Sequence, residues 1–482
     1  MRLRPLIKDI VNDANLYPNL EINNISTNSC AVKKGSLFFA IKGSNHDGHD
    51  YISDAIKNKV SAIIANKELK NLPVPLIKVK DTRRVLSKIA SKFYKNPSKK
   101  IKIIGVTGTN GKTTTSSLIK SIFDSAGIDA AQLGTNGLIS KYNFYNSSLT
   151  TPDPIYLNKL ISMLVEKKVS YLIMEVSSHS IDQHRVTDIE FDTAIFTNLS
   201  QDHLDYHKTI SNYFNTKLNL FKMIKENRKC IINFDNKYGK MIDKKIKKET
   251  VKSSINLKVD FYYKSLTCDM NGINGIISHN NENIPISSDL VGEFNAENIL
   301  LAVSACKIIG LDTESITKGI KNCIKPCGRM EIFKKDNIKI IIDYAHTPDA
   351  YEKVLSSIKN LNKGKINILF GCGGNRDKTK RAAMGSIADK YSDYLWITPD
   401  NPRLEDIDKI NNQIINGIKS NHYSSYNDRE KGLKDALGTL KNDDILIVLG
   451  KGRENYQLIK NERIFHSDYE IIMEYINENW ST

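Results

Sequence analysis

The segment that most constrains the fold is residues 101–114, where a short β-branched run leads into a glycine-containing loop. We expect residues 101–107 to form a buried strand and a helix to begin near Lys112. This order of strand, glycine loop and helix is typical of the start of a nucleotide-binding α/β domain, because loop N–H groups and a helix N-terminus favour phosphate oxygens.

The loop carries the residue types that phosphate binding needs. Glycines allow close backbone approach, Lys112 adds a positive charge, and the Thr113 hydroxyl can ligate Mg²⁺. The strict pattern of the common NTPase loop would place glycine at position 106, where Val106 stands. A chance glycine turn would leave the preceding strand, the lysine and three successive threonines unexplained. The expected ATP-binding residues here are Gly108, Thr109, Asn110, Gly111, Lys112, Thr113 and Thr114.

The rest of the chain alternates between candidate buried strands and helices, which predicts an α/β fold with three domains. A polar stretch at residues 96–100 and a Pro-Cys-Gly-Arg segment at 326–329 indicate the boundaries. We predict a small mixed α/β N-terminal domain (1–97), a P-loop central domain with a mostly parallel sheet (98–327) and a Rossmann-like C-terminal domain (328–482). The expected strands after the loop are 171–176, 193–197, 230–233, 338–343, 366–370, 394–398 and 445–449, with helices at 155–166 and 213–225.

Polar and charged residues follow the ends of these strands. In open parallel sheets, ligands bind at the carboxyl ends of the strands, so we expect these groups to meet at a site. They are Lys112, Glu175, Asp202, His203, Asp343, Arg376, Asp400 and Glu454.

The net charge of +16 (70 Lys and Arg against 54 Asp and Glu) admits a nucleic-acid binder. The lysines are scattered over the whole chain, however, and no aromatic-basic pattern accompanies them. The seven cysteines show no CxxC spacing, and no run of about 18 apolar residues occurs. We therefore expect a cytoplasmic monomer that binds no nucleic acid and inserts into no membrane.

Several motifs together resemble those of the Mur ligase family, whose phosphate loop is shared with folylpolyglutamate synthetases. Besides the Thr-Gly-Thr-Asn-Gly-Lys-Thr-Thr loop, the matching segments are Glu-Val-Ser-Ser-His at 175–179, Asp-His-Leu-Asp-Tyr-His at 202–207, Gly-Arg-Met-Glu at 328–331 and Asp-Tyr-Ala-His-Thr-Pro at 343–348. The resemblance runs over nearly the whole chain. It implies a ligase that uses ATP and Mg²⁺ to activate a carboxylate as an acyl phosphate.

The resemblance also implies roles for individual residues. Lys217 would be carbamylated by CO₂ and would hold Mg²⁺ together with Thr113 and Glu175. Without the motif, Lys217 would be interpreted as a solvated helix lysine and residues 175–178 as a strand edge. The implied catalytic residues are Lys112, Glu175, His203, Lys217 and His346, and the further nucleotide-binding residues are Asn295, Arg329 and Asp343.

The segment Asp-Asn-Pro-Arg at 400–403 resembles that of the family members that add meso-diaminopimelate. Diaminopimelate carries a second carboxylate that lysine lacks, and the Arg403 guanidinium can bind it bidentately. Without the resemblance to the family, the segment would be interpreted as a turn, since Asn-Pro favours turns. The implied amino-acid-binding residues are Arg376, Asp400, Asn401, Pro402, Arg403, Gly450 and Glu454.

The resemblance places a UDP-linked substrate on the N-terminal and central domains. An Asp-Ser-Arg triplet of the family appears here as Asn-Ser-Cys at 28–30, so uridine binding depends mainly on Ser29, and the frame of a uracil-binding loop remains at 43–48. The implied substrate-binding residues are Ser29, Thr150, Thr151, Ser177, Gln183 and Arg185.

The function that the resemblance implies is ATP-dependent addition of meso-diaminopimelate to UDP-N-acetylmuramoyl-L-alanyl-D-glutamate, a step of peptidoglycan precursor synthesis. Two alternatives stay open. One is the version of the ligase that adds L-lysine. The other is a P-loop ATPase stimulated by nucleic acid, which the +16 charge would suit.

Overall fold

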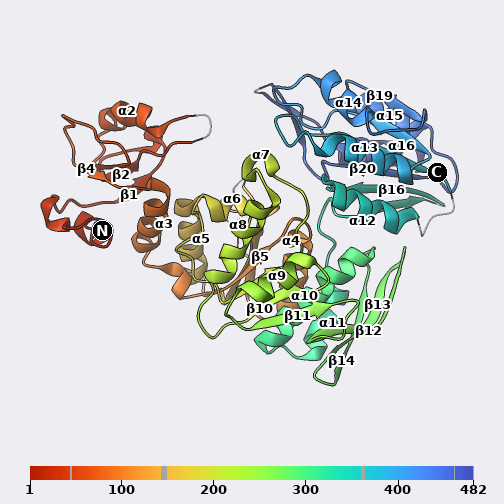
Figure 1. Ribbon diagram of the computed structural model, residues 1–482, viewed down its shortest axis with the longest axis horizontal. Coiled ribbons are helices and arrows are strands. Elements are labelled where there is room, and N and C mark those ends of the chain that lie inside the picture. Colours follow the sequence, from red (N-terminus) through yellow and green to blue (C-terminus); the bar gives the residue numbers. More distant parts are fainter. Residues whose placement is uncertain (44–45, 143–148, 336, 360–363, 461, 481–482) are drawn as a thin grey trace.

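The computed structural model describes residues 1–482 except 44–45, 143–148, 336, 360–363, 461 and 481–482. Three large sheets follow one another along the described chain, at Asn24–Lys78, Lys102–Ser288 and Glu331–Leu449, and a two-stranded sheet formed by Tyr456–Ile459 and Glu462–Phe465 comes after them. In Figure 1 the red N-terminal part, the central part and the blue C-terminal part form three distinct bodies. The three-domain α/β architecture is confirmed, and the boundaries at 97/98 and 327/328 stay predictions that fall between the sheets.

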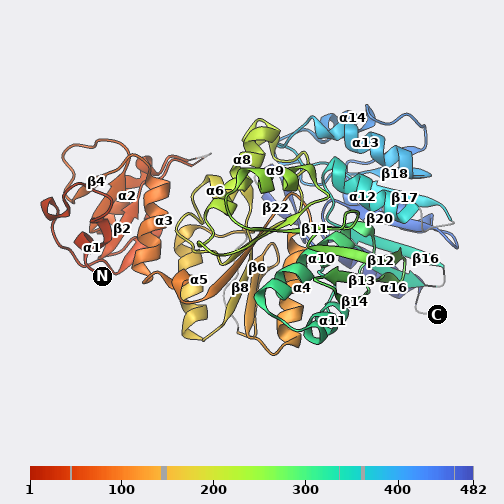
Figure 2. The ribbon, with the colours of Figure 1, turned by 60° about the horizontal axis from the view of Figure 1, so that its bottom comes forward.

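The N-terminal domain is built on a four-stranded sheet in the order β1-β2-β3-β4, with all neighbours parallel. Apolar residues cover both faces of this sheet, and α3 also packs against α5 of the central domain (Figures 1 and 2). Its elements are α1 (Leu3–Ile7), β1 (Asn24–Ser26), β2 (Ser36–Phe39), α2 (Ile52–Lys57), β3 (Ala62–Ala65), β4 (Leu76–Lys78) and α3 (Thr82–Phe93), with 3-10 turns at Ala14–Leu16, Ser29–Ala31, Gly48–Tyr51 and Pro97–Lys99.

The central sheet has the order β14-β13-β12-β11-β10-β9-β5-β8-β6-β7. Within the part of this order that runs β12-β11-β10-β9-β5-β8-β6, every two neighbouring strands are parallel, which confirms the mostly parallel sheet. The sequence analysis did not foresee the antiparallel extension of β12, β13 and β14. The strands are β5 (Lys102–Thr107), β6 (Ala130–Gly134), β7 (Gly137–Ile139), β8 (Tyr171–Glu175), β9 (Thr193–Phe196), β10 (Cys230–Asn233), β11 (Thr250–Ser254), β12 (Phe261–Asp269), β13 (Gly272–His279) and β14 (Glu282–Ser288).

Helices cover both faces of the central sheet, because successive side chains of a strand point to opposite faces. Ile104 and Val106 of β5 pack with α4, α10 and α11, whereas Ile103 packs with α5 and α8. The helices are α4 (Lys112–Ser125), α5 (Pro154–Glu166), α6 (Ser178–Asp182), α7 (Leu204–His207), α8 (Ile210–Lys222), α9 (Lys237–Lys245), α10 (Glu293–Ile309) and α11 (Thr313–Lys321).

The C-terminal sheet has the order β15-β16-β20-β17-β18-β19, and only its edge strand β15 is antiparallel to its neighbour. This doubly covered, nearly parallel sheet agrees with the Rossmann-like prediction. The elements are β15 (Glu331–Lys335), β16 (Ile338–Asp343), α12 (Pro348–Lys359), β17 (Ile366–Phe370), α13 (Lys380–Tyr391), β18 (Tyr394–Ile397), α14 (Ile407–Ile415), β19 (Tyr423–Ser425), α15 (Arg429–Gly438), β20 (Ile445–Leu449), the hairpin β21 (Tyr456–Ile459) and β22 (Glu462–Phe465), and α16 (Asp468–Asn479).

The polar residues expected at strand ends lie there: Glu175 is the last residue of β8, and Asp343 is the last of β16. Within the described ranges, no helix is both long enough and apolar enough to cross a membrane. The carboxyl ends of the central and C-terminal sheets face the same region of the molecule, and this is where the candidate site lies.

Candidate active site

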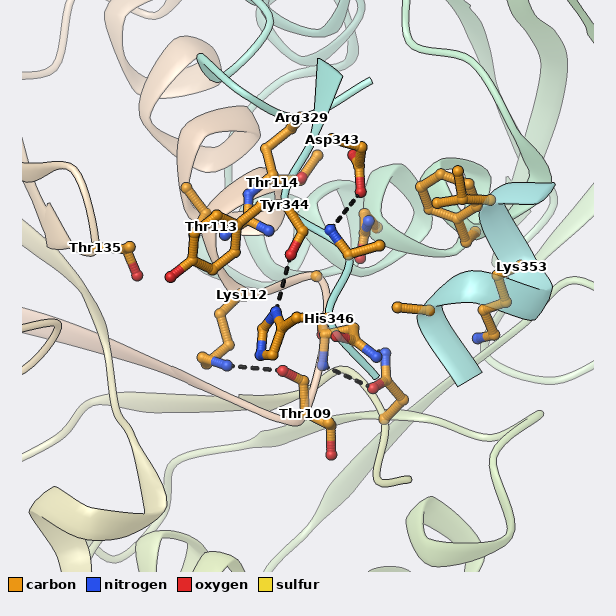
Figure 3. A pocket seen from close by; sticks show the side chains of 18 of the residues that line it. Thr109, Lys112, Thr113, Thr114, Thr135, Arg329, Asp343, Tyr344, His346 and Lys353 are labelled. Atoms are coloured by element: carbon orange, nitrogen blue, oxygen red, sulfur yellow. Dashed lines mark hydrogen bonds between the residues drawn. The ribbon is translucent and has the colours of Figure 1, made fainter. Parts of the chain in front are cut away.

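Two adjoining pockets occupy the space between the central and C-terminal domains. The first has a cavity volume of about 230 Å³ and is lined by the phosphate loop on one side and by residues 329–354 on the other (Figure 3). The second is lined largely by the C-terminal domain. Asp202, His203, Tyr344 and His346 line both pockets and form a shared wall. The predicted residues in the first pocket are Thr109, Asn110, Gly111, Lys112, Thr113, Thr114, Thr150, Glu175, Ser177, His203, Asn295, Arg329, Asp343 and His346.

The phosphate loop is held by close contacts that only glycine allows. A Cβ on Gly108 would lie 1.9 Å from the Thr197 hydroxyl, and one on Gly111, whose φ is +83°, would lie 2.3 Å from Asn298 Oδ1. The Lys112 ammonium group donates to the carbonyls of Gly108 (3.0 Å) and Thr109 (2.9 Å), so it folds over the loop. Burial lowers the pKa of Lys112. The loop therefore presents backbone N–H groups, a helix N-terminus and one buried amine to an anion.

Glu175 and Thr113 bring two oxygen ligands together beside the loop. The Thr113 hydroxyl donates to Glu175 Oε1 at 3.0 Å, and the Thr135 backbone N–H and hydroxyl donate to the same carboxylate at 3.0 and 3.1 Å. A Cβ on Gly134 would lie 2.0 Å from Glu175 Oε1, so glycine is required there. Among the described residues, no group of three or more His, Cys, Asp or Glu is poised for a metal. One carboxylate and one hydroxyl fit Mg²⁺, which takes few protein ligands and completes its shell with phosphates and water.

Lys217 lies on α8 with only 1% of its surface exposed. Its Nζ donates to the Gly108 carbonyl at 2.9 Å and lies 4.7 Å from the centre of the Tyr213 ring. Burial, together with the charge of Lys112, lowers the pKa of Lys217 well below its usual range. In the described part of the chain, no carboxylate lies within ion-pair distance of this amine. Burial at this position therefore favours the neutral form of the Lys217 amine over the charged form.

Asp202, at the shared wall, is a buried carboxylate surrounded by one lysine and two histidine side chains. His203 Nε2, His346 Nε2 and Lys380 Nζ lie 3.3, 3.7 and 3.5 Å from its oxygens. Burial alone would raise the pKa of Asp202, but the hydrogen bond from His346 and the charges of His203, His346 and Lys380 hold that pKa well below its usual range. Burial lowers the pKa of His203 to about 3, so this ring is neutral at physiological pH.

Asp343 and Arg329 line the other end of the first pocket. Asp343 accepts backbone hydrogen bonds from Met330 (2.8 Å) and Ala345 (2.7 Å), which fix the turn that carries His346. The Arg329 guanidinium lies 4.5 Å from the centre of the Tyr344 ring. Asn295 is buried at the start of α10 and accepts a hydrogen bond from Asn298 at 3.0 Å. Figure 3 shows Arg329, Asp343 and Tyr344 around the same pocket as Lys112, Thr113 and Thr114 of the phosphate loop.

The second pocket gathers most of the amino-acid-binding residues expected from the sequence. Arg403 has φ +54° and donates from NH1 to the Gly374 carbonyl at 2.9 Å. Burial lowers the pKa of Arg403. Glu454 accepts from Asn401 Nδ2 at 3.1 Å and from the Tyr344 hydroxyl at 3.0 Å. The predicted residues that line this pocket are Arg376, Asp400, Asn401, Arg403, Gly450 and Glu454.

The remaining predicted residues line neither pocket. Thr151 donates to the Glu175 carbonyl at 2.8 Å and, through its own carbonyl, accepts from Arg185 at 2.9 Å. Arg185 also donates to Gln183 Oε1 at 2.7 Å, so these residues support the β8 end of the first pocket. Ser29 is buried in the N-terminal domain. The expected uracil-binding segment at 43–48 lies partly outside the described residues. The residues outside both pocket linings are Gly108, Thr151, Gln183, Arg185, Lys217, Pro402 and Ser29.

The sequence analysis missed three residues that shape the site. Thr135 holds Glu175, Tyr344 joins the two pockets, and Lys380 reaches Asp202 from the other domain. Tyr344 lies between the predicted residues Asp343 and His346 in the motif at 343–348, and Lys380 lies four residues after Arg376. Their positions next to predicted site residues could therefore have indicated that they belong to the site. Thr135 gave none.

Comparisons with known proteins identify the family of this chain. Family models match over most of the chain: "Mur ligase family, catalytic domain" at 21–94, "Mur ligase middle domain" at 106–306 and "Mur ligase, glutamate ligase domain" at 328–452. The UDP-N-acetylmuramoyl-L-alanyl-D-glutamate–2,6-diaminopimelate ligase 1 of Clostridium acetobutylicum is 38% identical and covers 99% of this chain and 100% of its own length. The corresponding ligase of Aquifex aeolicus is 39% identical over 94% of this chain and 93% of its own.

Solved structures show the same architecture. A UDP-N-acetylmuramoyl-L-alanyl-D-glutamate–2,6-diaminopimelate ligase is 28% identical with a TM-score of 0.70, and the match covers 100% of both chains. The MurF ligase of Thermotoga maritima in complex with ADP shares the fold with a TM-score of 0.63 at 19% identity, covering 94% of this chain and 96% of its own. With three family models in order and relatives at this level of identity, the chain belongs to the Mur ligase family.

Proposed function

We propose that this enzyme adds meso-diaminopimelate to UDP-N-acetylmuramoyl-L-alanyl-D-glutamate, using ATP and Mg²⁺, in the cytoplasm and as a monomer. The observation that carries the proposal is the shared wall. A phosphate loop lies on one side of it and a pocket with Arg403 and Glu454 lies on the other. A carboxylate activated in the first pocket would therefore face an amine held in the second. The names of the relatives support the same reaction.

In the first pocket, the loop N–H groups and Lys112 would bind the ATP phosphates, with Asp343 and Asn295 on the nucleoside side. The D-glutamyl carboxylate would attack the γ-phosphorus, and ADP would leave with the bonding electron pair. Mg²⁺, when bound, offsets the negative charge that develops on the phosphoryl oxygens. Thr113 and Glu175 are the residues that would hold it.

Lys217 would supply a further oxygen ligand after reaction with CO₂. The neutral amine attacks the carbon of CO₂, a proton is released, and a carbamate anion forms. The low pKa of Lys217 supports this step, because only the unprotonated amine is a nucleophile. The neighbouring Lys112 ammonium group would stabilise the resulting negative charge.

In the second pocket, Arg403 would bind the distal carboxylate of diaminopimelate and Glu454 its ammonium group. The reacting amine then attacks the acyl phosphate, phosphate leaves with the bonding pair, and an amide forms. Lysine lacks the second, distal carboxylate, so the half-buried Arg403 guanidinium would not be paired with a carboxylate of the bound amino acid. The L-lysine alternative is therefore disfavoured, and none of the relatives described above supports a nucleic-acid-stimulated ATPase.

The test is a ligation assay with purified enzyme, ATP, Mg²⁺ and the UDP-linked dipeptide, in which meso-diaminopimelate and L-lysine are compared. We expect amide formation with diaminopimelate and at least about tenfold lower kcat/KM with lysine. A preference for lysine would contradict the assignment of Arg403. ATP hydrolysis that responds to DNA or RNA, and not to the two substrates, would contradict the ligase.

A further inference from the structure

The start of α13 attaches the C-terminal domain to the central domain beside both pockets. Gln201 of the central domain donates hydrogen bonds to Asp377 Oδ2 at 3.2 Å and to Thr379 Oγ1 at 3.0 Å. The next residues on each side, Asp202 and Lys380, form an ion pair at 3.5 Å. Two adjacent central-domain residues thus contact three residues within one short segment of the other domain.

Lys380 is the charged member of this junction. Only 8% of its surface is exposed, and its ammonium group also donates to the His346 carbonyl at 2.9 Å. Burying a lysine costs free energy unless a partner compensates it, and the carboxylate in contact is Asp202. Because Asp202 belongs to the other domain, the ammonium group is compensated in this way only while the two domains are docked. Both residues that Lys380 contacts line both pockets.

We propose that Lys380 is a positioning residue, whose ion pair with Asp202 holds the amino-acid pocket against the ATP-side pocket so that the amine reaches the acyl phosphate before water does. The inference rests on the proposed function and adds a coupling role that neither the phosphate loop nor Arg403 supplies. Lys380 acts through Asp202 and the docked position of the domain, and it makes no bond to the reacting atoms.

Two fates of the acyl phosphate make this role measurable. If the amine attacks the carbonyl carbon, the carbon–oxygen bond to phosphate breaks, the nitrogen loses a proton, and one phosphate appears for each amide. If water attacks, the same bond breaks, and phosphate and the free carboxylate appear with no amide. Loosening the domain junction admits water, so the ratio of phosphate to amide rises above one.

The experiment compares Lys380→Gln and Lys380→Arg in the full chain. We expect Lys380→Gln to raise the KM for diaminopimelate by about tenfold or more, since small displacements from reactive geometry are costly. We also expect a phosphate-to-amide ratio above one, while the KM for ATP changes less. Lys380→Arg, which keeps the charge, should restore most of the coupling.

The matched control is Lys378→Gln. Lys378 lies two residues away, its side chain is 59% exposed, and it pairs with Glu405 inside its own domain at 3.4 Å. This control should keep the wild-type ratio and KM values. Asp202→Asn combined with Lys380→Gln should be no worse than the more impaired single variant, because the two residues act as one pair.

A Lys380→Gln enzyme with a ratio of one and an unchanged KM for diaminopimelate would overturn the inference. So would a folded variant that releases no phosphate at all, since Lys380 would then be needed for phosphoryl transfer itself. If Lys380→Gln fails to fold, judged by tryptophan fluorescence, Asp202→Asn with Lys380→Arg carries the same test of coupling. A wild-type enzyme that forms no amide would instead contradict the proposed function.

Discussion

Two fully buried cations in this molecule show opposite chemistry. Arg429, in the C-terminal domain, donates to Asp468 at 2.9 and 2.7 Å and to the Thr398 hydroxyl at 3.0 Å. Burial would lower the pKa of Arg429, but the charge and hydrogen bonds of Asp468 raise it above its usual value. Lys217 is buried as deeply, but its amine contacts only a carbonyl and the Tyr213 ring among the described residues, and its pKa is lowered.

The difference separates a structural cation from a reactive one. A compensated guanidinium stays charged and ties α15 to α16 and to the end of β20. Burial without a carboxylate partner lowers the pKa of Lys217 and so favours its neutral form, which is the nucleophilic form that our proposed reaction with CO₂ requires. Burial alone therefore does not identify a functional cation. The distinguishing feature of Lys217 is that no carboxylate among the described residues lies within ion-pair distance of its amine.

The largest effect is expected from breaking the compensated pair. Asp468→Asn should lower the free energy of unfolding by about 3–5 kcal/mol, because it leaves a buried guanidinium uncompensated. The folded pKa of Asp468 is depressed, so its contribution is present above the unfolded pKa of about 3.9 and is lost as the pH falls through the folded value. Both tryptophans, Trp396 and Trp480, lie in the C-terminal domain, so their fluorescence during urea unfolding measures this. A decrease of less than about 1 kcal/mol in the free energy of unfolding would contradict the assignment of Arg429 as a structural cation compensated by Asp468.

Removing the uncompensated amine should affect activity instead. Lys217→Met should lower kcat by at least about a hundredfold, since a ligand for Mg²⁺ is lost. In CO₂-free buffer, the free energy of unfolding of the Lys217→Met variant should be higher than that of the wild type. The pKa of Lys217 is lower in the folded chain than in the unfolded chain. At a pH between these two values the unfolded wild-type chain therefore binds a proton that the folded chain does not, and this lowers the stability of the wild type. Ligation assays and urea unfolding measure the two effects. A gain in mass equal to one CO₂ on a wild-type peptide containing Lys217, absent from the variant, would identify the carbamate directly.

A smaller effect is expected at Arg403, which is half-buried and bound to carbonyl groups. Arg403→Ala should raise the KM for diaminopimelate by about ten- to a hundredfold with less change in kcat, since a charged hydrogen bond contributes about 1.5–3 kcal/mol. Arg228→Ala is the control, because Arg228 is an exposed residue of a loop in the central domain. This variant should have the wild-type KM for diaminopimelate. Equal KM values for Arg403→Ala and the parent would show that another group binds the carboxylate.

The smallest effect is expected one residue after Arg429, on the same helix. Glu430 pairs with Lys434 at 2.8 Å, but both side chains are about half exposed. Solvent screening leaves such pairs with little net contribution. Glu430→Gln should leave the urea midpoint unchanged within error in the assay used for Asp468→Asn. A clear loss would mean that pairing alone, without burial, stabilises α15.

Much of the fold could be predicted because the parallel strands are short β-branched runs between helices. Residues 230–233, 338–343, 366–370 and 445–449 were predicted as strands with the bounds that the structure has, and α4 begins at Lys112 as expected. The hairpin strands β12–β14 were not predicted. β14 alternates between exposed and buried positions, and β12 and β13 mix buried with exposed positions, so none of the three is a continuous apolar run.

The site was predictable where a motif keeps its residues close in sequence, as in the loop and the segment at 400–403. The contacts between domains were not predictable. Lys380 and Asp202 are 178 residues apart and belong to different domains, so their pairing depends on how the two folded domains dock. Tyr344 and Glu454 belong to the same domain but are 110 residues apart, so their contact depends on the tertiary fold of that domain. Local patterns carry no information about such docking.

The wall shared by the two pockets also matters for inhibition. Asp202, His203, Tyr344 and His346 line both the pocket that we propose for ATP and the pocket that we propose for the amino acid. Two weak fragments, one for each pocket, could be joined by a linker that passes these four side chains. Because the second fragment would then bind at a high effective concentration, the joined compound should bind far more tightly than either part.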